Sequence, residues 1–77
     1  MWNKGELTVN GRIYKYCIKH YDEPSEYGIM GGKISKLEIR TADDNILTCN
    51  YDRGWDLKAK DKGSITVLAY LLRRYNR

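Results

Sequence analysis

The sequence contains no phenylalanine, one proline, one histidine and two cysteines among its 77 residues. The single proline and a hydrophobic fraction of 42% argue against a disordered chain. No apolar run reaches the roughly 18 residues of a membrane span, and the first residues lack the basic start and apolar stretch of a signal peptide. Two cysteines in such a chain favour reduced thiols and a cytoplasmic protein. The length admits one hydrophobic core, so residues 1–77 are predicted to form a single domain.

A β-hairpin is predicted near the N-terminus. Asn10-Gly11 is the residue pair best suited to a type I′ turn, in which both central residues have positive φ. The pair separates residues 7–9 from residues 13–18, which alternate between apolar and polar side chains. The register of a two-residue turn pairs Val9 with Arg12, Leu7 with Tyr14 and Gly5 with Tyr16.

A second hairpin is predicted from residues 33–40 and 46–51, joined by the turn Ala42-Asp43-Asp44-Asn45. From Ser64 to about Asn76 the sequence has the periodicity of an amphipathic helix, with Ser64 or Asp61 as its N-cap. The predicted apolar arc consists of Ile65, Leu68, Ala69, Leu71, Leu72 and Tyr75. The fold class is therefore α+β, a four-stranded antiparallel sheet of two hairpins with one C-terminal helix packed on it (ββββα).

A core of this size supplies only about 3–5 kcal/mol of stability. Dimerisation through an uncovered sheet face or edge would add to it, so a homodimer stays an open alternative at this point.

The connection between the two hairpins, residues 22–32, is long and rich in glycine. Gly31-Gly32-Lys33 followed by Ser35 is similar in composition to a phosphate-binding loop, but a strand follows where the Walker pattern requires a helix. The alternative is an irregular connection whose apolar residues fold inward. The residues considered for contact with a partner here are Tyr27, Ile29, Met30, Lys33 and Lys36.

A second informative loop reads Tyr51-Asp52-Arg53-Gly54-Trp55-Asp56. Gly54 is predicted to be left-handed, and Arg53 lies within reach of both flanking aspartates, so the loop is interpreted as a structural clasp before the helix. The functional alternative makes Arg53 and Trp55 an exposed pair of the type enriched at binding hot spots.

No catalytic constellation is evident. His20 is the only imidazole, and an enzymatic interpretation would rest on it and on scattered carboxylates. Cys17 and Cys49 are predicted to point to opposite sides of the sheet, with Cys49 in the core, and neither has the spacing of a zinc ligand. The protein is therefore predicted to be no enzyme and to carry no metal and no cofactor.

The net charge of +4 is unevenly distributed. Residues 1–56 carry eight basic and nine acidic side chains, whereas residues 57–77 carry six basic side chains and one acidic one. Arginine and tyrosine on one surface can contact phosphates and stack on bases. The predicted anion-binding residues are Lys58, Lys60, Lys62, Tyr70, Arg73, Arg74 and Arg77.

Trp2, the segment from Ser25 to Leu37 and the motif Tyr51-Asp52-Arg53-Gly54-Trp55-Asp56 together resemble an uncharacterised family, grouped as a domain of unknown function. Its members are small single-domain proteins of bacteria, phages and other mobile elements. The resemblance implies no activity, cofactor or catalytic residue. It implies a small accessory protein in a setting where inhibitors of host defence are common.

Two functions are therefore expected as alternatives. The first is a binding protein for an anionic partner, nucleic acid or nucleotide, acting through the basic C-terminal helix. The second is a protein-interaction module that docks on a host protein through the two loops. A membrane partner is not expected.

Overall fold

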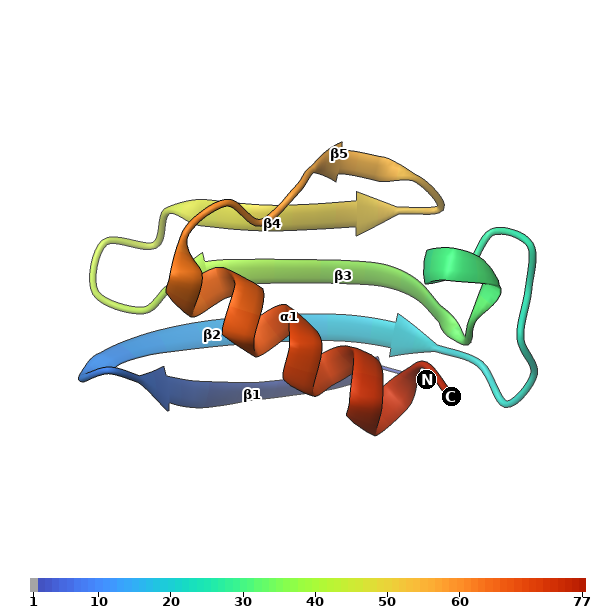
Figure 1. The fold of residues 1–77 in the computed structure, drawn as a ribbon, viewed down its shortest axis with the longest axis horizontal. Helices are drawn as coiled ribbons and strands as arrows, with labels where there is room; N and C mark the ends of the chain where they lie inside the picture. The colour runs from blue at the N-terminus through green and yellow to red at the C-terminus, as the bar shows by residue number, and fades with distance from the viewer. Residues whose placement is uncertain (1) are drawn as a thin grey trace.

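The computed structural model describes residues 2–77. Five antiparallel strands form one sheet in the order β1-β2-β3-β4-β5, and the single α-helix lies across one face of it (Figure 1). The elements are β1 (Trp2–Val9), β2 (Arg12–His20), a 3₁₀ turn η1 (Ile29–Gly31), β3 (Ile34–Thr41), β4 (Leu47–Asp52), β5 (Trp55–Leu57) and α1 (Lys62–Tyr75). Within residues 2–77, no helix combines the length and apolar character that crossing a membrane requires.

The sheet has five strands, so the predicted four-stranded sheet is wrong in strand number. The additional strand, β5, pairs with β4 through Tyr51 and Trp55 and contains three residues. A strand of three residues is too short to show an alternating pattern, which explains why the sequence did not indicate it. The antiparallel sheet and the C-terminal helix are confirmed.

The first hairpin has the predicted register. Asn10 and Gly11 both have positive φ, at 52° and 80°, as a type I′ turn requires. The strand pairs Val9–Arg12, Leu7–Tyr14 and Gly5–Tyr16 are all present. This register places apolar side chains of β1 and β2 on the face that α1 covers.

Asp61 is the N-cap of α1, and the alternative cap, Ser64, is wrong. The Asp61 carboxylate accepts hydrogen bonds from the Ser64 backbone N–H at 3.0 Å and from the Tyr14 hydroxyl at 2.9 Å. Ser64 itself is fully buried, and its hydroxyl donates to Thr48 Oγ1 at 2.6 Å. The cap therefore attaches the first turn of the helix to the sheet.

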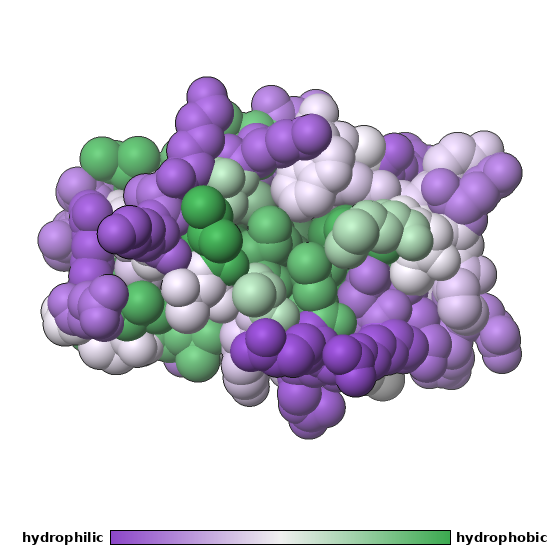
Figure 2. All heavy atoms as spheres, in the orientation of Figure 1, coloured by the Kyte–Doolittle hydropathy of each residue, from purple (hydrophilic) through white to green (hydrophobic). Residues whose placement is uncertain are grey.

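The buried side of α1 is rotated relative to the predicted arc. Val67 and Leu71 are fully buried, whereas Ile65, predicted to face the sheet, is 48% exposed. The bond between Asp61 and Tyr14 sets this rotation, and Gly63 lies so close to Tyr14 that an added Cβ would come within 2.1 Å of its hydroxyl. Figure 2 shows the resulting face, with apolar side chains at its centre and hydrophilic ones around them.

The core lies between α1 and the sheet. It contains Ile18, Leu37, Ile39 and Cys49, all at most 1% exposed. Burial raises the pKa of the Cys49 thiol to about 11. Cys17 lines the opposite, uncovered face, so the two cysteines lie on opposite sides of the sheet, as predicted.

Candidate anion-binding site

The two loops singled out in the sequence lie against each other at one end of the sheet. The Tyr51 hydroxyl donates a hydrogen bond to the Tyr27 carbonyl at 2.7 Å, and the Arg53 backbone N–H donates to the Ser35 carbonyl at 3.0 Å. The Trp55 ring meets the Tyr51 ring edge-on, with centroids 5.0 Å apart. These contacts bring residues from before β3 and after β4 to one place.

The glycine-rich loop is closed by the residue that follows the helix. Asn76 donates through Nδ2 to the Ile29 carbonyl and accepts through Oδ1 from the Ile34 N–H, both at 2.9 Å. Gly32 has to be a glycine because an added Cβ would lie 2.3–2.4 Å from the Asn76 side-chain atoms. The end of α1 thus holds the loop in position.

This loop divides its apolar residues between the core and the solvent. Ile29, predicted as a partner contact, is fully buried, because η1 turns its side chain into the core. That assignment of Ile29 is therefore wrong. Met30, Tyr27 and Trp55 are 81%, 57% and 36% exposed, and Met30 has a φ of 51°.

The turn before β5 differs from the predicted clasp. Arg53, rather than Gly54, is left-handed, with a φ of 56°. Its guanidinium is 3.9 Å from Asp52, while the Asp56 carboxylate accepts from the Asn50 side chain instead. The arginine side chain is 68% exposed and is not held by two carboxylates.

Two lysines stand opposite each other on the uncovered face. The β2–β3 register pairs Lys19 with Lys36, and the β3–β4 register pairs Lys36 with Asp52. The Lys36 ammonium is 3.9 Å from Asp52. Like charges directly opposite each other on neighbouring strands are unfavourable, so this pair carries an electrostatic cost.

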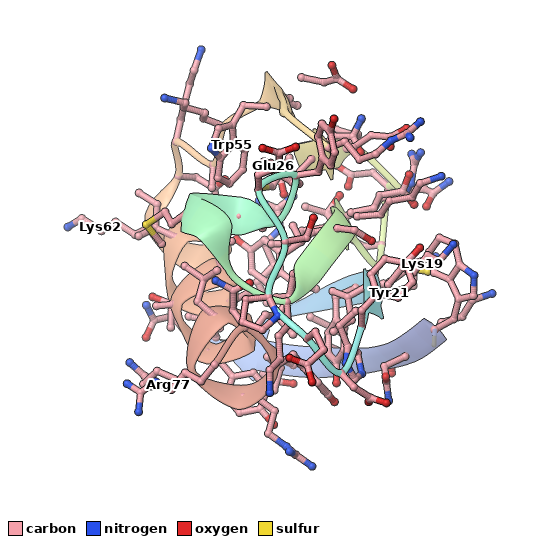
Figure 3. All side chains as sticks on the ribbon, turned by 90° about the vertical axis from the view of Figure 1, so that its right-hand side faces the viewer. Lys19, Tyr21, Glu26, Trp55, Lys62 and Arg77 are labelled. Atoms are coloured by element: carbon pink, nitrogen blue, oxygen red, sulfur yellow. The ribbon has the colours of Figure 1, made fainter. Side chains whose placement is uncertain are left out.

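These lysines line a hollow of about 340 Å³ at this end of the uncovered face. We call it the lysine hollow, and its lining consists of Lys19, Tyr21, Ser25, Tyr27, Ser35, Lys36 and Arg53. Figure 3 looks at this end of the sheet and shows Lys19 and Tyr21 on the side away from the helix. The lining supplies three cations, two hydroxyls of serine and two phenol rings.

A β-bulge shapes the floor of the lysine hollow. The register of β2 and β3 shifts between Lys19 and His20, which leaves Ser35 as the extra residue of β3. The Ser35 hydroxyl donates to the Lys19 carbonyl at 3.3 Å. On the other side of β3, the Ser35 carbonyl accepts from the Arg53 backbone N–H, which places the arginine turn beside the hollow.

Lys19 lies between two aromatic rings. Its ammonium is 5.7 Å from the Trp2 ring centroid and 5.4 Å from that of Tyr21. Hydrogen bonding by Lys19, reinforced by its charge, lowers the pKa of the Tyr21 phenol. A lowered phenol pKa means that the negatively charged form is favoured, as it is in a region of positive electrostatic potential.

A second hollow, of about 360 Å³, adjoins the first through Tyr21. We call it the terminal hollow, and its lining consists of Asn3, His20, Tyr21, Asp22, Lys33, Arg74, Tyr75 and Arg77. His20 Nε2 is 2.9 Å from Asn3 Oδ1, and the His20 ring packs on Tyr75. The two hollows together place cations from the uncovered face round to the end of α1.

The structure separates the predicted basic patch into two parts. Arg74 and Arg77 line the terminal hollow, together with Lys33 of the loop. The remaining members are exposed but line neither hollow: Lys58, Lys60, Lys62, Tyr70 and Arg73. In Figure 3, Lys62 projects on the helix side, away from Lys19 and Tyr21.

The predicted loop residues Tyr27, Lys36 and Arg53 do come together, in the lysine hollow. The sequence reasoning missed Lys19, Tyr21, Ser25 and Ser35. Strand alternation places Lys19 and Tyr21 on one face, but only the register of β2 and β3, which joins distant residues, shows that Lys36 lies opposite Lys19. Within residues 2–77, no group of three His, Cys, Asp or Glu side chains lies close enough to hold a metal ion.

The chain belongs to the family described as Domain of unknown function (DUF7678), whose model matches residues 1–76. No curated protein and no solved structure matches it.

Proposed function

We propose that this member of an uncharacterised family is a small, non-enzymatic protein that binds single-stranded nucleic acid, with the phosphates held in the lysine hollow. The observation that carries the proposal is the placement of Lys19, Lys36 and Arg53 around one hollow, with two of the three directly opposite each other. Among the described residues that line the hollow there is no carboxylate and no imidazole. The lining therefore offers binding groups rather than an acid–base pair.

An anion would relieve the electrostatic cost of this arrangement. Asp52 is the nearest carboxylate, and it is shared, at 3.9 Å from both Lys36 and Arg53. The Lys19 ammonium lies near the rings of Trp2 and Tyr21. A phosphate oxygen between Lys19 and Lys36 would replace their repulsion by two attractive contacts, which supports a phosphate ligand.

The aromatic side chains favour a single strand over a duplex. Trp2, Tyr21 and Tyr27 are 53%, 48% and 57% exposed around the lysine hollow. Unpaired bases stack on such rings without regard to sequence, whereas bases in a duplex are already stacked. Two adjoining hollows that share Tyr21 offer a path for consecutive nucleotides, from the uncovered face to Arg74 and Arg77.

This proposal moves the predicted binding surface. The C-terminal helix contributes its last turn, and the crossover lysines before it take no part. A cytoplasmic location stays part of the proposal, because Cys17 and Cys49 are free and lie on opposite faces, where they cannot form a disulfide with each other. The phage or mobile-element setting stays a prediction from the resemblance.

The test is a fluorescence-anisotropy titration of a short labelled oligonucleotide at low salt. The site variant is Lys19→Gln/Lys36→Gln/Arg53→Gln, and the matched control is Lys58→Gln/Lys60→Gln/Lys62→Gln, which loses the same charge elsewhere. The site variant is expected to lose at least about tenfold in affinity, and the control less than about threefold. For the wild type, the logarithm of affinity should fall against the logarithm of salt concentration with a slope of roughly −2 to −4.

Equal losses in the two triple variants would contradict the lysine hollow as the site and leave only diffuse attraction. A larger loss of affinity in the control would show that the binding site lies on the segment before α1 and on the helix. Absence of binding at low salt would overturn the function itself. If a mononucleotide competes as well as an unlabelled oligonucleotide, the ligand is a nucleotide and not a nucleic-acid strand.

A second candidate function is supported by the helix-bearing face. Ile65, Met30 and Trp55 are all exposed, and Met30 is held out on a left-handed backbone. Figure 2 shows apolar side chains in the centre of that face, and exposed apolar side chains of this kind mark protein-docking surfaces. In a pull-down from host lysate, a protein retained by the wild type and lost with Met30→Asp would support docking over nucleic-acid binding.

A further inference from the structure

The outer edge of β1 is the longest exposed strand edge in the molecule. β1 contains eight residues and pairs only with β2 within the described chain, whereas the opposite edge strand, β5, has three. In Figure 1, β1 forms one border of the sheet, and α1 lies in a separate layer in front of it. A long strand edge presents unpaired backbone groups that can accept another strand.

The first turn determines which backbone groups of β1 are free. A type I′ turn bonds the two residues that flank it, here Val9 and Arg12, and bonded pairs then recur at every second residue. The odd-numbered residues of β1 therefore bond to β2. The residues whose N–H and C=O groups point outward are Trp2, Lys4, Glu6 and Thr8, and all four are exposed.

These outward residues are complementary to themselves. If two copies of β1 pair antiparallel about Gly5, Lys4 of each copy stands opposite Glu6 of the other, and the outward-pointing groups are in phase. Shifting the register by two residues places Lys4 opposite Lys4, or Glu6 opposite Glu6. Shifting it by one residue brings groups already bonded to β2 against free ones. Of these registers, only the one centred on Gly5 pairs opposite charges and keeps the outward-pointing groups in phase.

Gly5 suits the centre of such a pairing. Tyr16 covers it so closely that an added Cβ would lie 2.5 Å from the Tyr16 hydroxyl. At the symmetry axis Gly5 faces Gly5 of the second copy, at the shorter of the two spacings between antiparallel strands, and neither glycine places a side chain of its own between the two backbones.

We propose that two copies of this protein associate through β1, antiparallel and centred on Gly5, into one continuous ten-stranded sheet. The association involves none of the residues that line the lysine hollow. The axis at Gly5 places the two hollows at opposite ends of the dimer. Its test contains no nucleic acid, so this proposal and the proposed function can fail independently.

The test uses sedimentation equilibrium of the wild-type protein and two single variants, Lys4→Glu and Glu6→Lys. Each variant alone places like charges opposite each other twice, so its dimer dissociation constant should rise by at least about tenfold. An equimolar mixture of the two variants restores opposite charges at both positions and should dimerise about as tightly as the wild type. Lys58→Glu, far from β1, is the control and should behave as the wild type does.

Hydrogen exchange gives a second measurement. The amides of Lys4 and Glu6 should become protected as the protein concentration rises, whereas those of Gly5 and Leu7, bonded to β2, should be protected at every concentration. A wild-type protein that stays monomeric up to about 1 mM overturns the proposal. So does a mixture of the two variants that associates no better than either alone.

Discussion

The two ends of the sheet carry charged side chains of both signs and use them in opposite ways. We call them the turn end, with the Asn10-Gly11 turn and the helix N-cap, and the loop end, with the lysine hollow. At the turn end, Arg12 lies 3.6 Å from Asp44 and 3.9 Å from Asp43. At the loop end, Lys19 stands opposite Lys36. One end neutralises its charge internally, and the other leaves an excess of positive charge.

The hydrogen bonds differ in the same way. At the turn end, Asp61 accepts from the helix backbone and from Tyr14, and the Thr41 hydroxyl donates to Asp44. At the loop end, the bonds from Tyr51 and Asn76 hold loop backbone, while the cationic side chains stay exposed around a hollow. Charge at the turn end therefore stabilises the fold, whereas charge at the loop end is available to a ligand.

The largest effect on stability is expected at the turn end. Asp61→Ala removes the N-cap and leaves the Tyr14 hydroxyl without its acceptor, so the free energy of unfolding should fall by about 1–2 kcal/mol. Urea denaturation measures this change. The control is Asp43→Ala, which removes an exposed ion pair and should change the free energy by less than about 0.5 kcal/mol. Equal losses for the two variants would show that the cap does not hold the turn end together.

The same carboxylate makes stability depend on pH. Partial burial opposes its ionisation, but hydrogen bonds from Ser64 and Tyr14 lower the pKa of Asp61 below its ordinary value of 3.8. A carboxyl group with a lowered pKa in the folded state stabilises the fold above its unfolded pKa and loses this contribution as the pH falls through the folded value. Asp61→Asn should therefore lose less stability than the wild type on acidification below about pH 4. If both proteins lose the same free energy of unfolding as the pH falls, the ionisation of Asp61 does not contribute to the pH dependence of stability.

A smaller effect is expected from the bond that joins the two loops. Tyr51→Phe removes the hydroxyl that donates to the Tyr27 carbonyl and should lower the free energy of unfolding by about 1 kcal/mol. Thermal and urea denaturation measure it, with Tyr27→Phe, at an exposed ring, as the control that should stay within about 0.5 kcal/mol. If Tyr51→Phe is as stable as the wild type, the loop end does not depend on this bond.

The smallest effect on stability is expected where the effect on binding is large. Lys36→Gln loses one exposed ion pair and relieves repulsion with Lys19, so the free energy of unfolding should change by less than about 0.5 kcal/mol. Its oligonucleotide affinity should nevertheless fall by about threefold or more. Asp61→Ala at the turn end should show the reverse, with weakened stability and an affinity no lower than that of the wild type. Parallel losses in both variants would remove the distinction between the two ends.

The turn end was largely predictable from the sequence because its signals are local. Asn10-Gly11 determined the register of the first hairpin through a two-residue turn, and Asp61 stood among the predicted caps. The loop end was not, because it depends on contacts between distant residues. The bulge at Ser35, the left-handed Arg53 and the bonds of Asn76 have no local pattern in the sequence. The opposition of Lys19 and Lys36 follows from the register between β2 and β3, which the long connection between these strands does not determine. Ile65 was misplaced because the periodicity predicts an amphipathic helix but does not determine how far the helix is rotated about its own axis when it packs on the sheet.

The hydrogen bonds of Asn76 determine which part of the fold can form last while the protein is being synthesised. Asn76 reaches Ile29 and Ile34 across 47 and 42 residues of chain, whereas the first hairpin needs only neighbouring residues. Local contacts form before distant ones, so a nascent chain can pair its strands while the glycine-rich loop still lacks its last anchor. Residue 76 must therefore emerge from the ribosome before Asn76 can bond to the glycine-rich loop and hold it in place behind the lysine hollow. A chain that stops short of Asn76 should therefore keep a protected first hairpin and show protease cleavage in residues 22–32.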